Sequence, residues 1–224
     1  MIRSALIAAC TGLLVATGAV SQTTENRLTL MAVLREIVAE NKQDDTLVPT
    51  GAKRYGATDG KEITLDIAGF NFIGDIQVRF DYDGPTRMRT LMRQEFEALG
   101  LTPEQAVKLA VSNIKRTYGP PTLTALPTGG SLLTLEKEGS LASSYFLDRD
   151  FWRDLLKQHP EGIAVAVPER AALLFAPLSA RMGVDFLRDR IADLHAGSKL
   201  MRISSAVYLF KDDRWTVLQP AREH

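Results

Sequence analysis

The residues closest to a catalytic pattern are Ser112 and Lys115, which stand three positions apart in the tetrapeptide SNIK. This spacing places both side chains on one helix turn, as in the SxxK pattern of serine acyl-transferring enzymes, some of them exported. Those enzymes put the serine at the start of a helix, whereas Ser112 is expected well inside one. The partner motifs Ser-Asp-Asn and Lys-Thr-Gly are absent from the sequence. We therefore interpret the pair first as part of a helix face and only second as catalytic.

Histidine is scarce, with only His159, His195 and His224 in the chain. None has the HExxH or HxH spacing of metal ligands, so no metal site and no cofactor are predicted. Both internal histidines are expected near helix C-termini, where a cation interacts favourably with the helix dipole. His159 is kept as a weak catalytic candidate.

Three arginines and one tryptophan are weak ligand-binding candidates. Arg87 and Arg89 fall near one face of an expected helix, and Arg79 lies in the strand before it. They could bind an anion, but a solvated helix face is the favoured interpretation. Trp152 belongs to the densest aromatic cluster, for which core packing is favoured over a binding groove.

The first residues have the pattern of a secretory signal peptide. A short segment with one positive charge, residues 1–4, precedes an uncharged apolar run over 5–20. Ala19 and Ser21 place small residues where a signal peptidase reads, which predicts cleavage between Ser21 and Gln22. The apolar run is shorter than the ~20 residues of a membrane span, so a retained anchor is the minority interpretation. We expect an exported protein, periplasmic or secreted.

Cleavage would change what chemistry the mature chain can do. The only cysteine, Cys10, lies in the expected signal peptide, so thiol catalysis, disulfides and thiolate metal sites are excluded. A lipid anchor on Cys10 is rejected because the apolar segment before it is too short. The 27 basic and 27 acidic side chains balance, and removal of Arg3 leaves a slight acidic excess. We therefore expect no nucleic-acid partner, no membrane span in the mature chain, and an unknown protein or small-molecule partner.

The elements that would position these residues follow from hydrophobic spacing. The most distinct is a helix over 102–119, which opens with a Thr102-Pro103-Glu104-Gln105 capping box. We expect further helices over 26–42, 86–99, 148–156 and 180–194, and strands over 62–67, 76–83, 122–126, 132–136, 142–147, 162–167, 171–175, 205–211 and 215–218. This order predicts one α+β domain over 22–224, with a mainly antiparallel sheet and helices packed on it.

The second half of the chain resembles the YtpQ-like family of unknown function. The similarity covers about 119–218 and rests on Leu141-Ala142-Ser143, the Phe151-Trp152 helix, the segment 162–170 and the segment 209–217, with a weaker echo at 63–66. The sequence departs from that family's pattern at Ala171, where an acidic residue is usual, and at Ala142-Ser143, where an aspartate is common. The family has no established activity, so the resemblance implies a fold more than a function.

Three functions remain open at this point. The leading hypothesis is a non-enzymatic exported protein that binds a partner or small ligand in the cell envelope. The alternative is a periplasmic hydrolase or transferase that uses scattered carboxylates, or Ser112 with Lys115. A scaffold whose aromatic corner forms an interface is the third.

Overall fold

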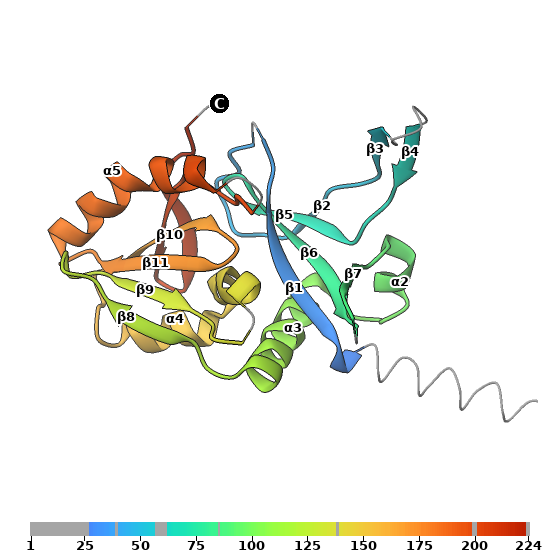
Figure 1. The fold of residues 1–224 in the computed structure, drawn as a ribbon, viewed down its shortest axis with the longest axis horizontal. Coiled ribbons are helices and arrows are strands. Elements are labelled where there is room, and N and C mark those ends of the chain that lie inside the picture. Colours follow the sequence, from blue (N-terminus) through green and yellow to red (C-terminus); the bar gives the residue numbers. More distant parts are fainter. Residues whose placement is uncertain are drawn as a thin grey trace, which may run out of the picture.

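The computed structural model describes residues 27–38, 40–56, 62–84, 86–137, 139–198 and 201–222. The signal peptide expected over 1–21 lies outside these residues. Every strand pair among them is antiparallel, and helices pack on the sheets, which confirms the predicted α+β class (Figure 1).

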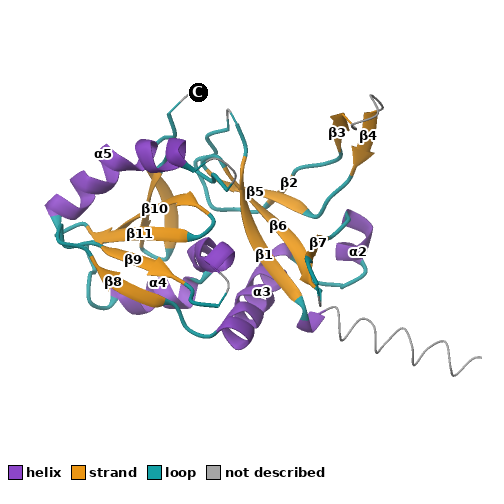
Figure 2. Ribbon diagram, in the orientation of Figure 1, coloured by secondary structure: helices purple, strands orange, loops and turns teal. Residues whose placement is uncertain are grey.

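The strands form two main sheets and a separate hairpin (Figure 2). The first sheet contains β1 (Leu30–Glu36), β2 (Val48–Pro49), β5 (Gly69–Ile73), β6 (Ile76–Asp83) and β7 (Met88–Thr90). The second contains β8 (Thr122–Ala125), β9 (Ser131–Thr134), β10 (Ile163–Glu169), β11 (Ala172–Pro177), β12 (Val207–Lys211) and β13 (Arg214–Gln219). The hairpin of β3 (Lys53–Gly56) and β4 (Glu62–Leu65) projects from the rest of the molecule (Figure 1). The helices are α2 (Arg93–Glu97), α3 (Pro103–Tyr118), the 3₁₀ helix η1 (Gly139–Leu147), α4 (Arg149–Leu156) and α5 (Arg181–Gly197).

The second sheet has the order β13-β12-β10-β11-β9-β8, and its central strands β10 and β11 are buried on both faces. Helix α5 lies across one face (Figure 1), where Val184, Leu187 and Ile191 pack on alanines of β10 and β11. The alternate residues of the same strands, such as Val165 and Phe175, enter the main core on the other face. This alternation explains why β10 and β11 read as continuous apolar runs in the sequence.

The first sheet has the order β1-β6-β5-β2, with β7 pairing to the far end of β6. Helix α3 packs on β1 and is tied to the segment before it by Asn113. The Asn113 amide is fully buried and donates to the carbonyl oxygens of Arg27 and Leu30, at 2.8 and 2.9 Å. The Ser144 hydroxyl of η1 donates to the Ala32 carbonyl at 2.7 Å. Helix α3 and η1 are therefore both fixed to the same strand.

The helix predicted over 26–42 is wrong, because its centre is strand β1. Leu30 to Leu34 are buried at every position, between β6, α3 and η1, so the segment lacks the alternation that marks a strand. Because apolar residues occupy every position, they also occupy the positions of a helical pattern, although no helix forms. The full ladder from β1 to β6 overrides that local signal.

Two other predicted elements are corrected. The strand expected over 142–147 is part of the 3₁₀ helix η1, in which Leu141 to Leu147 are all buried and so show no periodicity. The helix expected over 86–99 divides into β7, which pairs with Asp81–Asp83 of β6, and the short helix α2. The strands β2, β3 and β5 were not predicted.

The remaining elements agree with the sequence patterns. In α3 the Thr102 hydroxyl accepts from the Gln105 N–H, and the Gln105 side chain accepts from the Thr102 N–H. The predicted helices at 148–156 and 180–194 are α4 and α5. Asp212 and Asp213 have φ values of 50° and 59° and form the tight turn of the predicted β12–β13 hairpin.

Candidate functional site

A cavity of about 480 Å³ opens between α3, the start of α4, β13 and the segment after β1. We call it the Trp215 cavity. Its apolar lining is formed by Leu47, Phe72, Val107, Val111, Leu147 and Trp215. These six residues lie on or beside five different elements, so the cavity exists only in the folded chain.

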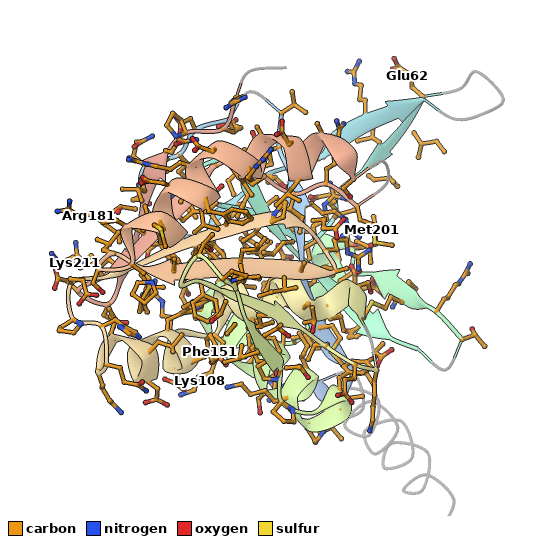
Figure 3. The ribbon with its side chains drawn as sticks, turned by 60° about the vertical axis from the view of Figure 1, so that its left-hand side comes forward. Glu62, Lys108, Phe151, Arg181, Met201 and Lys211 are labelled. Carbon is orange, nitrogen blue, oxygen red and sulfur yellow. The ribbon has the colours of Figure 1, made fainter. Side chains whose placement is uncertain are left out.

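One side of the Trp215 cavity is a polar ridge on α3. Glu104, Lys108, Ser112 and Lys115 follow one another at intervals of four, four and three residues, which places them along one face of the helix. The capping box at Thr102 fixes where this helix begins. Figure 3 shows Lys108 on this helix at the lower edge of the molecule.

Asp148 sits at the junction of η1 and α4 and is almost fully buried. Its side chain caps α4 by accepting from the Phe151 N–H at 3.4 Å, and it forms an ion pair with the Lys115 ammonium. The Lys115 side chain is 42% exposed, so one partner of the pair is buried and the other reaches the cavity mouth. A lysine bound in this way as an ammonium has no lone pair with which to take a proton from Ser112.

The opposite side of the cavity carries a network of ion pairs. Arg149 bridges Asp45 and Asp213, while Arg153 binds Asp213 through two hydrogen bonds of 2.9 Å. The hydrogen bonds from Arg153 hold the pKa of the Asp213 carboxyl below its usual value. Asp45 also accepts the backbone N–H of Trp215 at 3.1 Å, which ties the segment after β1 to β13.

Lys108 differs from these cations because it has no ion pair within the described part of the chain. Its side chain is exposed at the edge of the cavity. Lys108 is therefore not within ion-pair distance of any carboxylate of the described residues, and the nearest acidic residue on the ridge is the exposed Glu104, one turn before it.

Trp215 forms the aromatic wall of the cavity and is 1% exposed. Its ring lies 4.0 Å from the Phe146 ring centroid and 5.4 Å from that of Trp152. Within the described residues, its indole Nε1 has no hydrogen-bond partner. A buried N–H group of this kind ordinarily finds a partner, because leaving it unbonded costs about 1–3 kcal/mol.

The sequence candidates fall in several places. Ser112 and Lys115 both line the Trp215 cavity. His159 lies just after α4, where its backbone N–H bonds to the carbonyls of Leu155 and Leu156, and it lines neither cavity described here. Trp152 is completely buried, and its indole N–H donates to the Tyr145 and Phe146 carbonyls at 2.9 and 3.2 Å, so it is part of the core.

The candidate arginines do not share a helix face, because the segment expected as a helix begins as a strand. Arg89 lies in β7 and forms two hydrogen bonds of 2.9 Å with Glu95. Arg79 donates from β6 to the Gln77 side chain. Arg87 lines a second cavity, of about 510 Å³, whereas Arg79 and Arg89 line neither this cavity nor the Trp215 cavity.

Sequence reasoning missed the residues that join Arg87 in the second cavity. Arg35 and Arg170 lie 135 positions apart on β1 and after β10, and both line it. Single arginines so far apart in the sequence form no pattern that predicts their closeness in the fold. The two arginines come from different sheets, so only the packing of the folded chain brings them to one cavity.

Two further observations concern metals and membranes. Among the described residues, no group of three or more His, Cys, Asp and Glu side chains is placed to hold a metal ion. None of the helices in that part of the chain combines the length and the apolar character needed to cross a bilayer.

Comparisons with known proteins returned no relatives. No protein-family model, no curated protein and no solved structure matches the chain. The resemblance to the YtpQ-like family therefore stays a prediction from the sequence.

Proposed function

We propose that this protein is an exported binding protein of the cell envelope that holds a small amphipathic anion in the Trp215 cavity. The observation that carries the proposal is the combination of an apolar wall with an unpaired cation, Lys108, at the edge of one cavity. Export rests on the signal-peptide pattern of residues 1–21.

The size and lining of the cavity favour a small molecule. Ligand pockets typically measure about 300–1,000 Å³ and combine apolar walls with a few polar groups that orient the ligand. The Trp215 cavity meets both conditions. Phe72, Val111 and Trp215 would pack on the apolar body of the ligand.

The polar groups of the cavity favour a negative charge on the ligand. Lys115, Arg149 and Arg153 are already paired with carboxylates, so their charges are offset inside the protein. Lys108 is not, and it would attract the anionic end, which would lie away from the equally unpaired Glu104 one turn earlier on the ridge.

An acyl-transferring enzyme is the second candidate, since Ser112 and Lys115 line this same cavity. It is less well supported. The ion pair between Lys115 and Asp148 occupies the group that would have to act as the base. A binding function uses the same cavity without that requirement.

Fluorescent probes that differ only in charge test the proposed function. 8-Anilinonaphthalene-1-sulfonate is an amphipathic anion, and N-phenyl-1-naphthylamine is the same aromatic body without the sulfonate. Ser112→Phe places a ring in the cavity from an exposed position. We expect this variant to bind both probes about tenfold or more weakly than the parent protein does. We expect Lys108→Gln to bind the anionic probe roughly threefold more weakly and the neutral probe with unchanged affinity.

Matched variants separate the cavity from the rest of the surface. Thr117→Phe adds the same ring to α3 outside the cavity, and Lys211→Gln removes an exposed charge from β12 (Figure 3). Both should bind the probes as the parent protein does. If Ser112→Phe binds them with unchanged affinity, the Trp215 cavity is not the binding site and the proposal is wrong.

A further inference from the structure

The segment between β1 and β2 forms part of the wall of the Trp215 cavity and carries Asp45 to it. One end of the segment is anchored at Lys42, whose N–H donates to the Gly74 carbonyl at 3.0 Å and whose carbonyl accepts from the Gly74 N–H at 2.7 Å. At the other end, Val48 enters β2. Between these points, the hydrogen bonds and ion pairs that join residues 43–46 to other elements of the described chain all belong to Asp45.

The contacts of Asp45 are those of a bound carboxylate. One oxygen atom, Oδ2, accepts a hydrogen bond from the Arg149 guanidinium and, at 3.1 Å, another from the backbone N–H of Trp215. Guanidinium groups and backbone N–H groups are donors with which proteins bind carboxylates. Asp45, Arg149 and Trp215 all line the Trp215 cavity, so a carboxylate that entered it would meet the same two donors.

Both donors are held in place by contacts other than Asp45. Arg149 binds Asp45 through Nη2, while its Nη1 donates to the Asp213 carbonyl at 2.5 Å. Trp215 is 1% exposed and pairs with Phe210 of β12. The place that Asp45 fills would therefore stay formed if Asp45 moved away, which lowers the entropy cost of binding another carboxylate there.

We propose that Asp45 is an internal ligand, and that the molecule bound in the Trp215 cavity is an apolar carboxylate that replaces Asp45 at Arg149 and Trp215. This inference rests on the proposed function and narrows its ligand from an amphipathic anion to a carboxylate. Exchange of one carboxylate for another conserves these hydrogen bonds, so burial of the apolar body of the ligand drives the exchange. Asp45 consequently lowers the affinity of the cavity for its ligand.

Lys108 and Arg149 then have different parts in binding. Lys108 is exposed at the edge of the cavity, so water screens its attraction for an approaching anion. The Arg149 side chain is only 34% exposed, and hydrogen bonds between a guanidinium and a carboxylate are stronger in such surroundings. We therefore assign the attraction of the ligand to Lys108 and the binding of its carboxylate to Arg149.

Titrations with 1-pyrenebutyrate and 1-pyrenebutanol, followed by pyrene fluorescence, test the role of Asp45. The two probes share one aromatic body, and only the first is a carboxylate. Asp45→Asn removes the charge and keeps an oxygen for the Trp215 N–H. We expect this variant to bind 1-pyrenebutyrate about tenfold more tightly than the parent protein does, and 1-pyrenebutanol with an affinity within about twofold of the parent's. Arg149→Gln should bind 1-pyrenebutyrate about tenfold or more weakly and 1-pyrenebutanol with unchanged affinity.

Asp150→Asn is the matched control for the loss of one negative charge at the cavity. Asp150 also lines the cavity and pairs with an arginine, but its side chain is 70% exposed, and its partner Arg153 is bound to Asp213 as well. We expect Asp150→Asn to bind 1-pyrenebutyrate less than about threefold more tightly than the parent protein does. The inference is overturned if Asp45→Asn binds this probe no more tightly than the parent or than Asp150→Asn, or if 1-pyrenebutanol gains as much affinity.

Two further variants keep the outcome clear. Arg149→Gln tests the site even if Asp45→Asn does not fold, because unchanged affinity of Arg149→Gln for 1-pyrenebutyrate also overturns the inference. Ser112→Phe separates this inference from the proposed function. Weaker binding of both pyrene probes by Ser112→Phe, with no gain in Asp45→Asn, rejects the internal ligand alone, whereas unchanged binding by Ser112→Phe rejects both.

Discussion

The Tyr208 hydroxyl donates a hydrogen bond of 2.7 Å to Oδ1 of Asp75, and this bond joins the two sheets. Asp75 lies in the turn between β5 and β6 of the first sheet, and Tyr208 lies in β12 of the second. The Ser204 hydroxyl donates to the same oxygen at 2.5 Å. All three side chains are buried. The Asp75 carboxylate is therefore the shared acceptor of a polar contact between the two sheets.

Asp75→Asn should change how stability depends on pH. Burial raises the pKa of Asp75 above its usual 3.8, so the folded protein binds this proton more tightly than the unfolded chain. Asp75 therefore makes the free energy of unfolding fall as pH rises from about 4 toward the raised pKa. Asparagine keeps the accepting oxygen without the charge. Urea unfolding over about pH 4–8 should show the variant gaining stability relative to the parent as pH rises.

The prediction for Asp75 is contradicted if the free energy of unfolding differs between the parent and Asp75→Asn by the same amount at every pH. Asp75→Leu is the complementary variant, because it removes the acceptor as well as the charge. It should leave the hydroxyls of Ser204 and Tyr208 unbonded and destabilise the protein by about 1–3 kcal/mol for each at low pH.

Gly74→Ala should destabilise the protein through contact with Tyr208. Gly74 has a φ of +56°, and a Cβ atom there would lie 2.8 Å from both Cε1 and the hydroxyl oxygen of Tyr208. Gly51→Ala is a matched control, since Gly51 has a φ of +69° with nothing within 4 Å of its added Cβ. Thermal and urea unfolding should give a loss of about 1 kcal/mol for Gly51→Ala and about 2–4 kcal/mol for Gly74→Ala. Equal losses would show that the contact with Tyr208 is unimportant.

The ion pair between Lys115 and Asp148 should contribute a measurable coupling energy. Lys115→Met leaves a buried carboxylate without its partner and should cost about 1 kcal/mol. Asp148→Asn keeps the cap of α4, so the double-mutant cycle isolates the pair, with an expected coupling of about 1 kcal/mol. The pair of Lys157 with Asp154 is exposed on both sides and should give a coupling near zero. A coupling near zero for Lys115 and Asp148 as well would contradict the role assigned to the pair.

The exported form should begin at Gln22. Intact-mass spectrometry of protein recovered from the periplasm or the medium should give the mass of residues 22–224. Because Cys10 is the only cysteine, the same preparation should also contain no titratable thiol after denaturation. Protein that retains Met1 and one thiol per chain would contradict export by cleavage.

Local signals in the sequence were enough for part of the fold. The capping box of Thr102 and Gln105 and the turn at Asp212 and Asp213 are formed by neighbours in the chain, so their patterns predict α3 and the last hairpin. Strand β1 and η1 are buried on all sides, and a fully buried segment shows no periodicity that distinguishes a helix from a strand.

The candidate sites were less predictable than the elements. Ser112 and Lys115 were found because they stand three positions apart in the sequence, and both line the Trp215 cavity. Asp45 and Trp215 line the same cavity from positions 170 apart, and no local pattern brings them together. Arg35 and Arg170 likewise line the second cavity from β1 and from the turn after β10, which belong to different sheets.

The stacking around Trp215 gives the protein an optical property. The chain has two tryptophans, and their ring centroids lie 5.4 Å apart in an edge-to-face contact. Trp215 also makes tilted contacts with Phe146 and Phe210. At this separation the excited states of the two indoles are coupled, so near-ultraviolet circular dichroism should carry an exciton signal that disappears when either ring is replaced. Because only Trp215 of the two lines a cavity, the emission spectrum of the unlabelled protein reports on occupancy there.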